Sequence, residues 1–233
     1  VDVARAAKVM WLNYPNNPTS AVATEEDFAS AIAYCRENDI ALLHDAAYSE
    51  VGYDGYQPGS FLQLAGSSEI GLEFHSLSKS YNMTGWRVGM AVGNADMIKA
   101  LFQIKANLDS GIPQAVQEMA MQALTGPQDC VAENVAKYKW RRDRVIHALT
   151  SMGLEVEVPR ASLYVWAPVP EGYQSAEFAA RLLEEIDIVV TPGSSYGKYG
   201  EGYIRLSLTT PDEQVEKGCQ RLEAWRIPPP NGG

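Results

Sequence analysis

Along the chain, short apolar runs alternate with longer segments in which apolar residues recur at every third or fourth position. Short runs are typical of buried strands, and the longer spacing is typical of helices with one apolar face. Their alternation predicts an α/β fold with a mainly parallel sheet. In the first half of the chain, we expect strands over residues 9–13, 40–43, 73–76 and 88–92.

Several helices can be placed by their first residues. Thr24, with Asp27 three residues further on, is typical of a capping box, and the helix that follows presents an apolar face that begins with Phe28. The chain becomes helical again after Pro113, a residue suited to a first helical turn. A longer apolar stripe then predicts a helix over residues 129–151.

The last third of the chain has the pattern of a smaller α/β unit. We expect strands over residues 163–166, 188–190 and 203–208, a helix capped by Ser175, and a capping box at residues 210–213 that opens the last helix. In the last strand, Ile204 and Leu206 alternate with Arg205. Because neighbouring strand residues face opposite sides, Arg205 is expected to face something polar, either water or an anion.

Three polar residues come shortly after predicted strands. They are Asn17, Asp45 and Lys79. In open α/β sheets, ligands bind at the edge formed by the carboxyl ends of the strands. The pattern therefore predicts a ligand site to which all three residues contribute.

Composition and charge narrow the choice of partners. The chain has 233 residues and a net charge of −10, which makes nucleic acid an unsuitable partner. No segment has the apolar length of a membrane helix, and no signal peptide is visible at the start. We expect a cytoplasmic protein that binds no membrane.

The cysteines and histidines suggest no metal site. Cys35, Cys130 and Cys219 are far apart and in no metal-binding spacing, so reduced thiols are expected, with Cys35 and Cys219 in the core. His44 and His75 precede two of the polar loops, but further ligands at a workable spacing are lacking. We expect both histidines to pack as ordinary side chains.

One set of motifs carries a more specific signal. The run 76–80 reads Ser-Leu-Ser-Lys-Ser, and an arginine follows Lys79 after eight residues. Before this run come the motifs Asn-Pro-Thr and Asp-x-x-Tyr, and after it comes an arginine on a C-terminal strand. The residues concerned are Asn17, Asp45, Tyr48, Ser76, Ser78, Lys79, Arg87 and Arg205. In type, order and separation, these residues resemble the class I/II aminotransferases, the pyridoxal-phosphate enzymes of fold type I.

The resemblance implies roles around the cofactor ring. Lys79 would bind the cofactor's aldehyde as a Schiff base and then act as the general base. Asp45 would keep the pyridine nitrogen protonated, and Tyr48 and Asn17 would hydrogen-bond the phenolic oxygen. Taken singly, each residue has a plainer interpretation: a surface lysine, a turn aspartate, a packed tyrosine, or an Asx turn before proline.

The resemblance also implies two anion sites. Arg87 would bind the cofactor phosphate beside the hydroxyls of Ser76 and Ser78, because an arginine fork gives two parallel charge-assisted bonds. Arg205 would bind the substrate α-carboxylate in the same way, with Asn17 also in the substrate site. No metal is implied.

The resemblance extends over nearly the whole chain but begins in the middle of the family's fold. It implies the C-terminal part of the fold type I large domain and a small C-terminal α/β domain. The expected divisions are a partial cofactor-binding domain at residues 1–128, a long interdomain helix at 129–152, and the small domain at 153–233. An N-terminal part is expected to be missing, and full-length members similar to this chain are homodimers.

Three functions remain open at this point. The first is an aminotransferase that moves an amino group between an amino acid and a 2-oxo acid; residues 80–86 look most like the LL-diaminopimelate/aspartate branch. The second is other pyridoxal-phosphate chemistry on the same scaffold, such as a β-lyase or a cyclopropane-carboxylate synthase. The third is an inactive fragment or a regulatory remnant. A regulator would need a basic DNA-binding segment, for which the sequence shows no sign.

Overall fold

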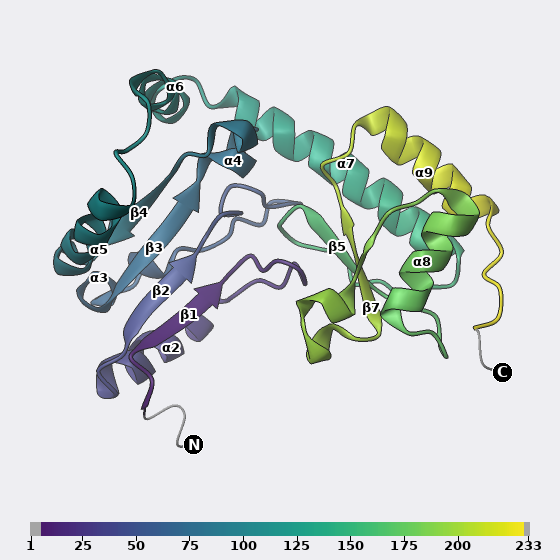
Figure 1. The fold of residues 1–233 in the computed structure, drawn as a ribbon, viewed down its shortest axis with the longest axis horizontal. Coiled ribbons are helices and arrows are strands. Elements are labelled where there is room, and N and C mark those ends of the chain that lie inside the picture. The colour runs from purple at the N-terminus through teal and green to yellow at the C-terminus, as the bar shows by residue number, and fades with distance from the viewer. Residues whose placement is uncertain (1–5, 231–233) are drawn as a thin grey trace. The chain divides into compact units, whose positions relative to one another are not determined.

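In the computed structural model, residues 6–230 are described, and they form two compact units (Figure 1). Unit 1 contains residues 6–16 and 21–134, and unit 2 contains residues 17–20 and 135–230. The short segment 17–20 therefore groups with the C-terminal half of the chain. Each unit has its own sheet.

Unit 1 is organised around a four-stranded sheet. The strands are β1 (Val9–Asn13), β2 (Ala41–Asp45), β3 (Gly71–Ser76) and β4 (Gly89–Gly93), in the order β1-β2-β3-β4. The first three strands are parallel, and β4 is antiparallel to β3. The expected mainly parallel sheet is confirmed, and each predicted strand agrees with the structure to within two residues at either end.

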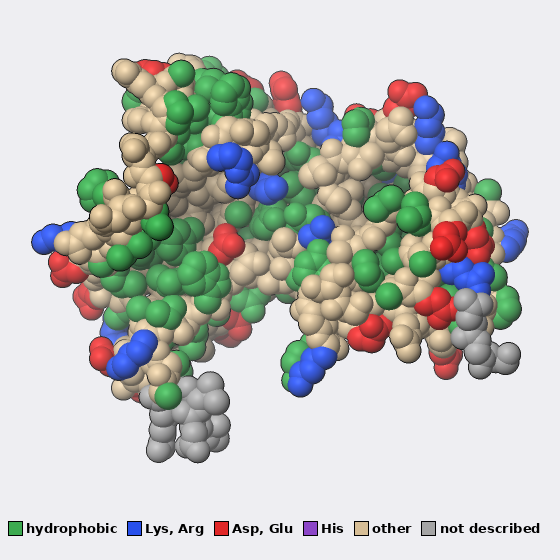
Figure 2. Space-filling view, viewed as in Figure 1, with side chains coloured by type: hydrophobic (Ala, Val, Ile, Leu, Met, Phe, Trp, Pro, Cys, Tyr) green, Lys and Arg blue, Asp and Glu red, His purple; other side chains and the backbone are tan. Residues whose placement is uncertain are grey.

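Helix α2 (Glu25–Glu37) packs on one face of this sheet. It begins as expected, because Thr24 and Asp27 form both bonds of the capping box. Its buried residues Phe28 and Cys35 join Leu42 of β2 in one hydrophobic cluster. On the other side of β1, Trp11 remains 59% exposed and stacks on Phe74 of β3 at 5.6 Å between ring centroids. Figure 2 shows hydrophobic side chains gathered over this part of unit 1.

Short elements and two longer helices complete unit 1. They are η1 (Phe61–Gln63), α3 (Ser67–Ile70), α4 (Leu77–Ser80), η2 (Thr84–Trp86), α5 (Ala95–Leu108) and α6 (Gln114–Thr125). Helix α6 packs through Val116 and Ala120 against Leu77 of α4 and against Val88, the residue before β4. Helix α5 lies before Pro113, in a segment for which the sequence analysis placed no helix.

Unit 2 contains a three-stranded antiparallel sheet with the order β5-β7-β6. Its elements are β5 (Tyr164–Pro168), α8 (Ser175–Ile186), β6 (Thr191–Pro192), η3 (Gly193–Tyr196), η4 (Lys198–Gly200), β7 (Tyr203–Ser207) and α9 (Asp212–Ala224). Helix α7 (Asp129–Ser151) begins in unit 1 and continues into unit 2, with the bounds expected from its apolar stripe. As the alternation predicts, Ile204 and Leu206 are buried.

Helices α7 and α9 are held together by ion pairs as well as by packing. Arg144 of α7 donates from Nε to Glu216 at 2.8 Å and from Nη1 to Glu223 at 2.6 Å, both on α9. Beneath these bonds, Cys219 is buried, as expected. Because one guanidinium binds two carboxylates, the side chains are fixed more firmly than in a single exposed ion pair.

Three local predictions for unit 2 are wrong. Residues 188–190 form no strand, and Val189 is 80% exposed; the strand β6 covers only the next two residues. Ser175 is the first residue of α8 and not its cap, because its side chain bonds Glu201 and Ser194 instead. Residues 210–213 form no capping box, since Pro211 occupies the cap position and provides no side-chain acceptor.

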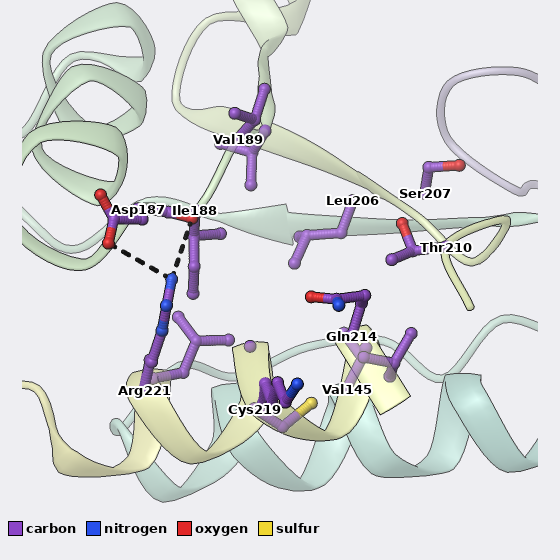
Figure 3. A pocket seen from close by; sticks show the side chains of 15 residues that line it. Val145, Asp187, Ile188, Val189, Leu206, Ser207, Thr210, Gln214, Cys219 and Arg221 are labelled. Atoms are coloured by element: carbon purple, nitrogen blue, oxygen red, sulfur yellow. Dashed lines mark hydrogen bonds and ion pairs between the residues drawn. The ribbon is translucent and has the colours of Figure 1, made fainter. Parts of the chain in front are cut away.

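A pocket in unit 2 lies among α9, β7 and residues 187–190 (Figure 3). Val145, Leu206 and Cys219 are among its lining, and Arg221 closes one side through an ion pair with Asp187 at 3.5 Å. None of the candidate site residues lines this pocket. Within residues 6–230, no helix is both long and apolar enough to cross a membrane.

Candidate functional site

The candidate cofactor residues of unit 1 meet at one edge of its sheet. Asp45 is the last residue of β2, and Ser76 is the last residue of the neighbouring parallel strand β3. Because β4 is antiparallel, its first residue Gly89 pairs with Ser76, so Arg87 lies at the same edge. Lys79 is in helix α4, which follows β3 directly. Sheet topology thus brings together residues that are up to 42 positions apart in the chain.

Lys79 is presented by a short, well-defined turn of helix. Ser76 begins this turn, because its Oγ accepts a hydrogen bond from the Ser78 amide at 3.2 Å. The turn is held at its other side by Thr84, whose hydroxyl donates to the Ser78 carbonyl at 3.1 Å. Ser78 itself is buried, and Lys79 is partly buried. The backbone of the turn that contains the two serines and the lysine is therefore held by bonds from the side chains of Ser76 and Thr84.

Both cations of this edge lack an acidic partner. Among the described residues, Lys79 makes no hydrogen bond or ion pair, and Arg87 donates only from Nη1 to the Thr84 carbonyl at 3.0 Å. Arg87 also has a left-handed backbone with φ of 53°, which is uncommon for a residue with a side chain. Two cations with spare donors form a suitable site for an anion such as a phosphate ester.

Asp45 is clamped through its backbone and not through its carboxylate. Its carbonyl accepts from Asn13 Nδ2 at 3.0 Å, and the next amide, that of Ala46, donates to the Phe74 carbonyl at 2.8 Å. No described residue bonds the Asp45 carboxylate. Tyr48 follows after a turn and is 5% exposed. An unpaired carboxylate at this edge could hold a protonated ring nitrogen of a ligand.

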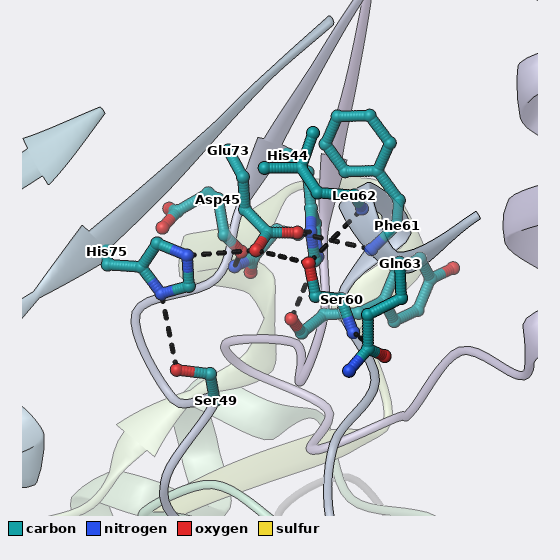
Figure 4. Close-up of polar contacts among 11 residues, drawn as sticks. His44, Asp45, Ser49, Ser60, Phe61, Leu62, Gln63, Glu73 and His75 are labelled. Carbon is teal, nitrogen blue, oxygen red and sulfur yellow. Dashed lines mark hydrogen bonds and ion pairs between the residues drawn. The ribbon is translucent and has the colours of Figure 1, made fainter. Parts of the chain in front are cut away.

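A buried polar cluster beneath this edge was missed by the sequence analysis (Figure 4). Glu73 of β3 is 1% exposed and bonds both His44 and His75, at 2.8 Å each. The two histidines pack as side chains of the sheet, as expected, but their shared bonds to Glu73 were not anticipated. A signal was available, because Glu73 lies between the apolar residues Leu72 and Phe74 of β3, and a buried carboxylate requires partners.

In unit 2, Arg205 of β7 is surrounded by aromatic rings, one amide oxygen and one hydroxyl. Its Nη1 donates to Asn17 Oδ1 at 2.8 Å, and its Nη2 donates to Thr191 at 3.4 Å. The guanidinium carbon lies 4.2 Å from the ring centroid of Tyr164 and 5.2 Å from that of Tyr196. Its Nε is buried without a hydrogen-bond partner, and none of the described carboxylates pairs with it.

The turn before β7 depends on two glycines. A Cβ at Gly193 would collide with the carbonyl oxygen of Gly200, and a Cβ at Gly200 would collide with that of Gly193. This close approach brings η3 against the sheet and places Tyr196 beside Arg205. The buried, unsatisfied N–H of Arg205 is a rare feature in a folded protein, and a bound carboxylate would satisfy it.

The candidate residues thus form two groups, each described within its own unit. Unit 1 contains Asp45, Tyr48, Ser76, Ser78, Lys79 and Arg87, and unit 2 contains Asn17 and Arg205. The first group fits a phosphorylated ring that has an aldehyde and a basic nitrogen. The second fits a carboxylate. Among residues 6–230, no group of three or more His, Cys, Asp or Glu side chains is arranged so that it could hold a metal ion.

Comparison with known proteins is consistent with these two groups of residues. Residues 2–222 match the family model described as aminotransferase class I and II. Over 225 residues, the chain is 60% identical to an LL-diaminopimelate aminotransferase of Dehalococcoides mccartyi strain 195, covering 97% of this chain and 58% of that protein. It is 52% identical over 221 residues to one of Desulforudis audaxviator, covering 95% of this chain and 56% of the relative.

Solved structures give the same picture. An aminotransferase from Staphylococcus aureus superposes with a TM-score of 0.90 at 38% identity, covering 95% of this chain and 59% of that one. This match confirms the predicted α/β fold of fold type I. The chain spans less than two thirds of the length of the relatives that it matches.

Proposed function

From the premise that this chain belongs to the class I and II aminotransferase family, we propose that the protein is a pyridoxal-phosphate-dependent aminotransferase. The observation that carries the proposal is the edge of the unit 1 sheet, where none of residues 6–230 gives Lys79 or Arg87 an acidic partner or the Asp45 carboxylate a basic one. Unpaired charges of both signs at one edge fit a zwitterionic, phosphorylated cofactor.

Each candidate residue of unit 1 has a specific role in this proposal. Lys79 would hold the aldehyde carbon of the cofactor through its Nζ, and its free amine would serve as the general base for the proton of the substrate Cα. Asp45 holds a proton on the ring nitrogen, and Tyr48 donates to the phenolic oxygen. When bound, the cofactor accepts the electron pair that is left at the substrate Cα.

The phosphate and the substrate are bound by arginine forks. Arg87 binds the phosphate together with the hydroxyls of Ser76 and Ser78. Arg205 binds the substrate α-carboxylate, to which its unpaired Nε and its Nη2 can donate in parallel. Asn17 orients that fork through its Oδ1 and uses its amide Nδ2 as the donor toward the phenolic oxygen.

Further parts of the proposal concern the whole protein. By analogy with the named relatives, we infer an LL-diaminopimelate-type enzyme that exchanges an amino group between an amino acid and a 2-oxo acid. From the resemblance of the sequence to the family, we further propose that the full-length form is a cytoplasmic homodimer. We assign residues 1–128 to a partial cofactor-binding domain, 129–152 to an interdomain helix and 153–233 to a small domain. The close agreement in name among relatives at 52–60% identity supports this substrate class.

The test is a transamination assay with defined donors. Protein loaded with pyridoxal phosphate is incubated with 2-oxoglutarate and either LL-diaminopimelate or aspartate, and the glutamate formed is measured. We expect glutamate in stoichiometric exchange with LL-diaminopimelate, and no glutamate from the Lys79→Ala variant. Lys99→Ala, an exposed lysine of α5, is the matched control and should keep full activity. Release of ammonia and a 2-oxo acid without glutamate would reveal a lyase and contradict the proposal.

A further inference from the structure

The buried polar cluster of unit 1 consists of Glu73, His44 and His75, and we refer to it as the Glu73 cluster (Figure 4). Glu73 and His44 are register partners on the adjacent strands β3 and β2. Their side chains are 1% and 0% exposed, whereas that of His75 is 25% exposed. Ionisable groups buried this deeply must satisfy one another, so their protonation can be deduced from their hydrogen bonds.

Glu73 is surrounded by donors on both of its oxygens. Its Oε1 accepts from Ser60 Oγ at 2.7 Å and faces His75 Nε2 at 2.8 Å, while its Oε2 accepts from the Phe61 amide at 3.2 Å and faces His44 Nδ1 at 2.8 Å. The Ser60 hydroxyl and the Phe61 amide donate to one oxygen each, and a carboxylate has a further acceptor position on each oxygen for a histidine N–H. Burial by itself would raise the pKa of Glu73, but the bonds from His44, His75 and Ser60 outweigh it and lower the pKa to about 2.

The two ring nitrogens of His44 face acceptors only. Nε2 is 2.9 Å from the Tyr14 carbonyl oxygen, which cannot donate, so Nε2 carries a proton. Nδ1 is 2.8 Å from Glu73 Oε2, and because Glu73 is ionised, the proton of this bond belongs to Nδ1. His44 therefore has a proton on each nitrogen and a positive charge.

His75 has a different pattern. Its Nε2 donates to Glu73, but its Nδ1 lies 3.4 Å from Ser49 Oγ, a hydroxyl that can donate to it. A neutral ring satisfies both contacts. The Glu73 cluster then contains one negative and one positive charge and is neutral as a whole, which is how a protein interior tolerates buried charges.

We propose that Glu73 and His44 form a buried carboxylate–imidazolium pair that positions the ends of β2 and β3. The neighbours of this pair offer no competing charge: besides His75 from β3, the His44 ring meets the Tyr14 carbonyl, Phe28 of α2 and Phe61 of η1. The rings of Phe28 and Phe61 lie at centroid distances of 5.0 and 5.9 Å and exclude water from the pair.

The position of the pair in the sequence indicates what it positions. His44 directly precedes Asp45, and His75 directly precedes Ser76. Glu73 therefore bonds the residue before the assigned ring-nitrogen partner and the residue before the assigned phosphate ligand. Alternation along each strand turns Asp45 and Ser76 to the opposite face, away from these charges. This positioning role rests on the proposed function, whereas the charge state of the pair does not.

The charge state can be read from the unaltered chain by NMR of the histidine rings. The sequence has three histidines, so selective ¹⁵N labelling gives few signals to assign. At pH 7 we expect directly observable protons on both Nδ1 and Nε2 of His44, and a single ring proton on His75. His147, which is exposed on α7, serves as the internal reference for rapid exchange. A single ring proton on His44 would overturn the proposal, and this count needs neither cofactor nor mutant.

The positioning role is tested with three variants of the cofactor-free chain. Glu73→Gln places an amide NH₂ against donors, so we expect the His44 ring to lose one proton and the backbone amide signals of Asp45 and Ser76 to shift. Glu73→Asp keeps the charge and should restore the second ring proton. Glu69→Gln, an exposed carboxylate of the same unit, should change none of these signals. Unchanged Asp45 and Ser76 signals in Glu73→Gln would overturn the positioning role.

Binding of pyridoxal phosphate then separates this inference from the proposed function. We expect Glu73→Gln to weaken cofactor affinity by at least about tenfold, and Glu73→Asp to recover most of it. Equal affinity in Glu73→Gln and the unaltered chain would overturn the positioning role. If the unaltered chain showed two His44 ring protons but bound no cofactor, the proposed function and the positioning role would fail, and the ion pair would stand.

Discussion

Arg205 donates a hydrogen bond from Nη1 to Asn17 Oδ1 at 2.8 Å, although the two residues are 188 positions apart in the chain. The bond explains why residues 17–20 group with the C-terminal unit. It also orients the guanidinium plane between the rings of Tyr164 and Tyr196. One edge of the fork is thereby held, and on the other edge the Nε donor has no hydrogen-bond partner among the described residues.

The first prediction concerns this fork. Arg205→Lys keeps the positive charge but removes the parallel donors, so the affinity for carboxylate substrates should fall about tenfold to a hundredfold. Pyruvate and 2-oxoglutarate should be affected alike, because they share the carboxylate that Arg205 is assigned to bind. Titration calorimetry on the cofactor-loaded protein measures both. Arg221→Lys, an exposed arginine of the same unit, is the control. An effect on 2-oxoglutarate alone would show that Arg205 binds the side-chain carboxylate.

The second prediction concerns acid stability. The pKa of Glu73 is lowered from 4.5 to about 2 in the folded state. A lowered pKa means that the stabilisation is fully present above about pH 4.5 and is lost as the pH falls toward 2, with a total of about 3 kcal/mol. Urea unfolding at pH 5 and pH 2.5 should show the advantage of the unaltered chain over Glu73→Gln shrinking across this window. A constant difference would contradict the ionised state of Glu73.

The third prediction concerns the bonds between α7 and α9. Arg144→Met removes the cation that joins Glu216 and Glu223, and we expect the free energy of unfolding to fall by about 1–2 kcal/mol. Raising the salt concentration should reduce this difference, because the carboxylates are partly exposed. Lys217→Met breaks an exposed pair with Glu213 on α9 and should cost about 0.5 kcal/mol or less. Equal losses in the two variants would contradict a special role for Arg144.

The fourth prediction concerns thiol reactivity. Burial raises the pKa of the Cys35 thiol and raises that of Cys219 to about 11, whereas Cys130 is exposed. Because the thiolate is the reactive form, iodoacetamide at pH 7.5 should modify Cys130 first and leave the other two intact. Mass spectrometry of the folded chain should find one adduct, and the chain in urea should give three. Early modification of Cys219 in the folded chain would contradict its burial.

Much of the fold follows from periodicity in the sequence. Helix α7 was predicted with its observed bounds because apolar positions recur along it from Val131 to Leu149, although Arg142 also lies on the buried face. The alternation in β7 placed Ile204 inside and Arg205 on the other face, which is where a polar contact was expected and found. Patterns that are long or strictly alternating leave few competing interpretations.

Other features could not be obtained in this way, for identifiable physical reasons. Helix α5 buries none of its residues, so nothing in the packing of the described chain marks its apolar positions. The run at residues 188–190 has strand-like composition but finds no strand partner. The pairing of Glu73 with His44 depends on strand register, which brings together positions 29 residues apart. Local sequence does not encode that register.

The central claim is that Lys79 is the residue to which pyridoxal phosphate attaches. The most direct measurement is to incubate the chain with pyridoxal phosphate, reduce it with borohydride and map the modified peptide by mass spectrometry. We expect one stoichiometric label on the peptide that contains Lys79, and no such label in the Lys79→Ala variant. A stoichiometric label on another lysine, or a chain that takes up no label at all, would contradict the claim.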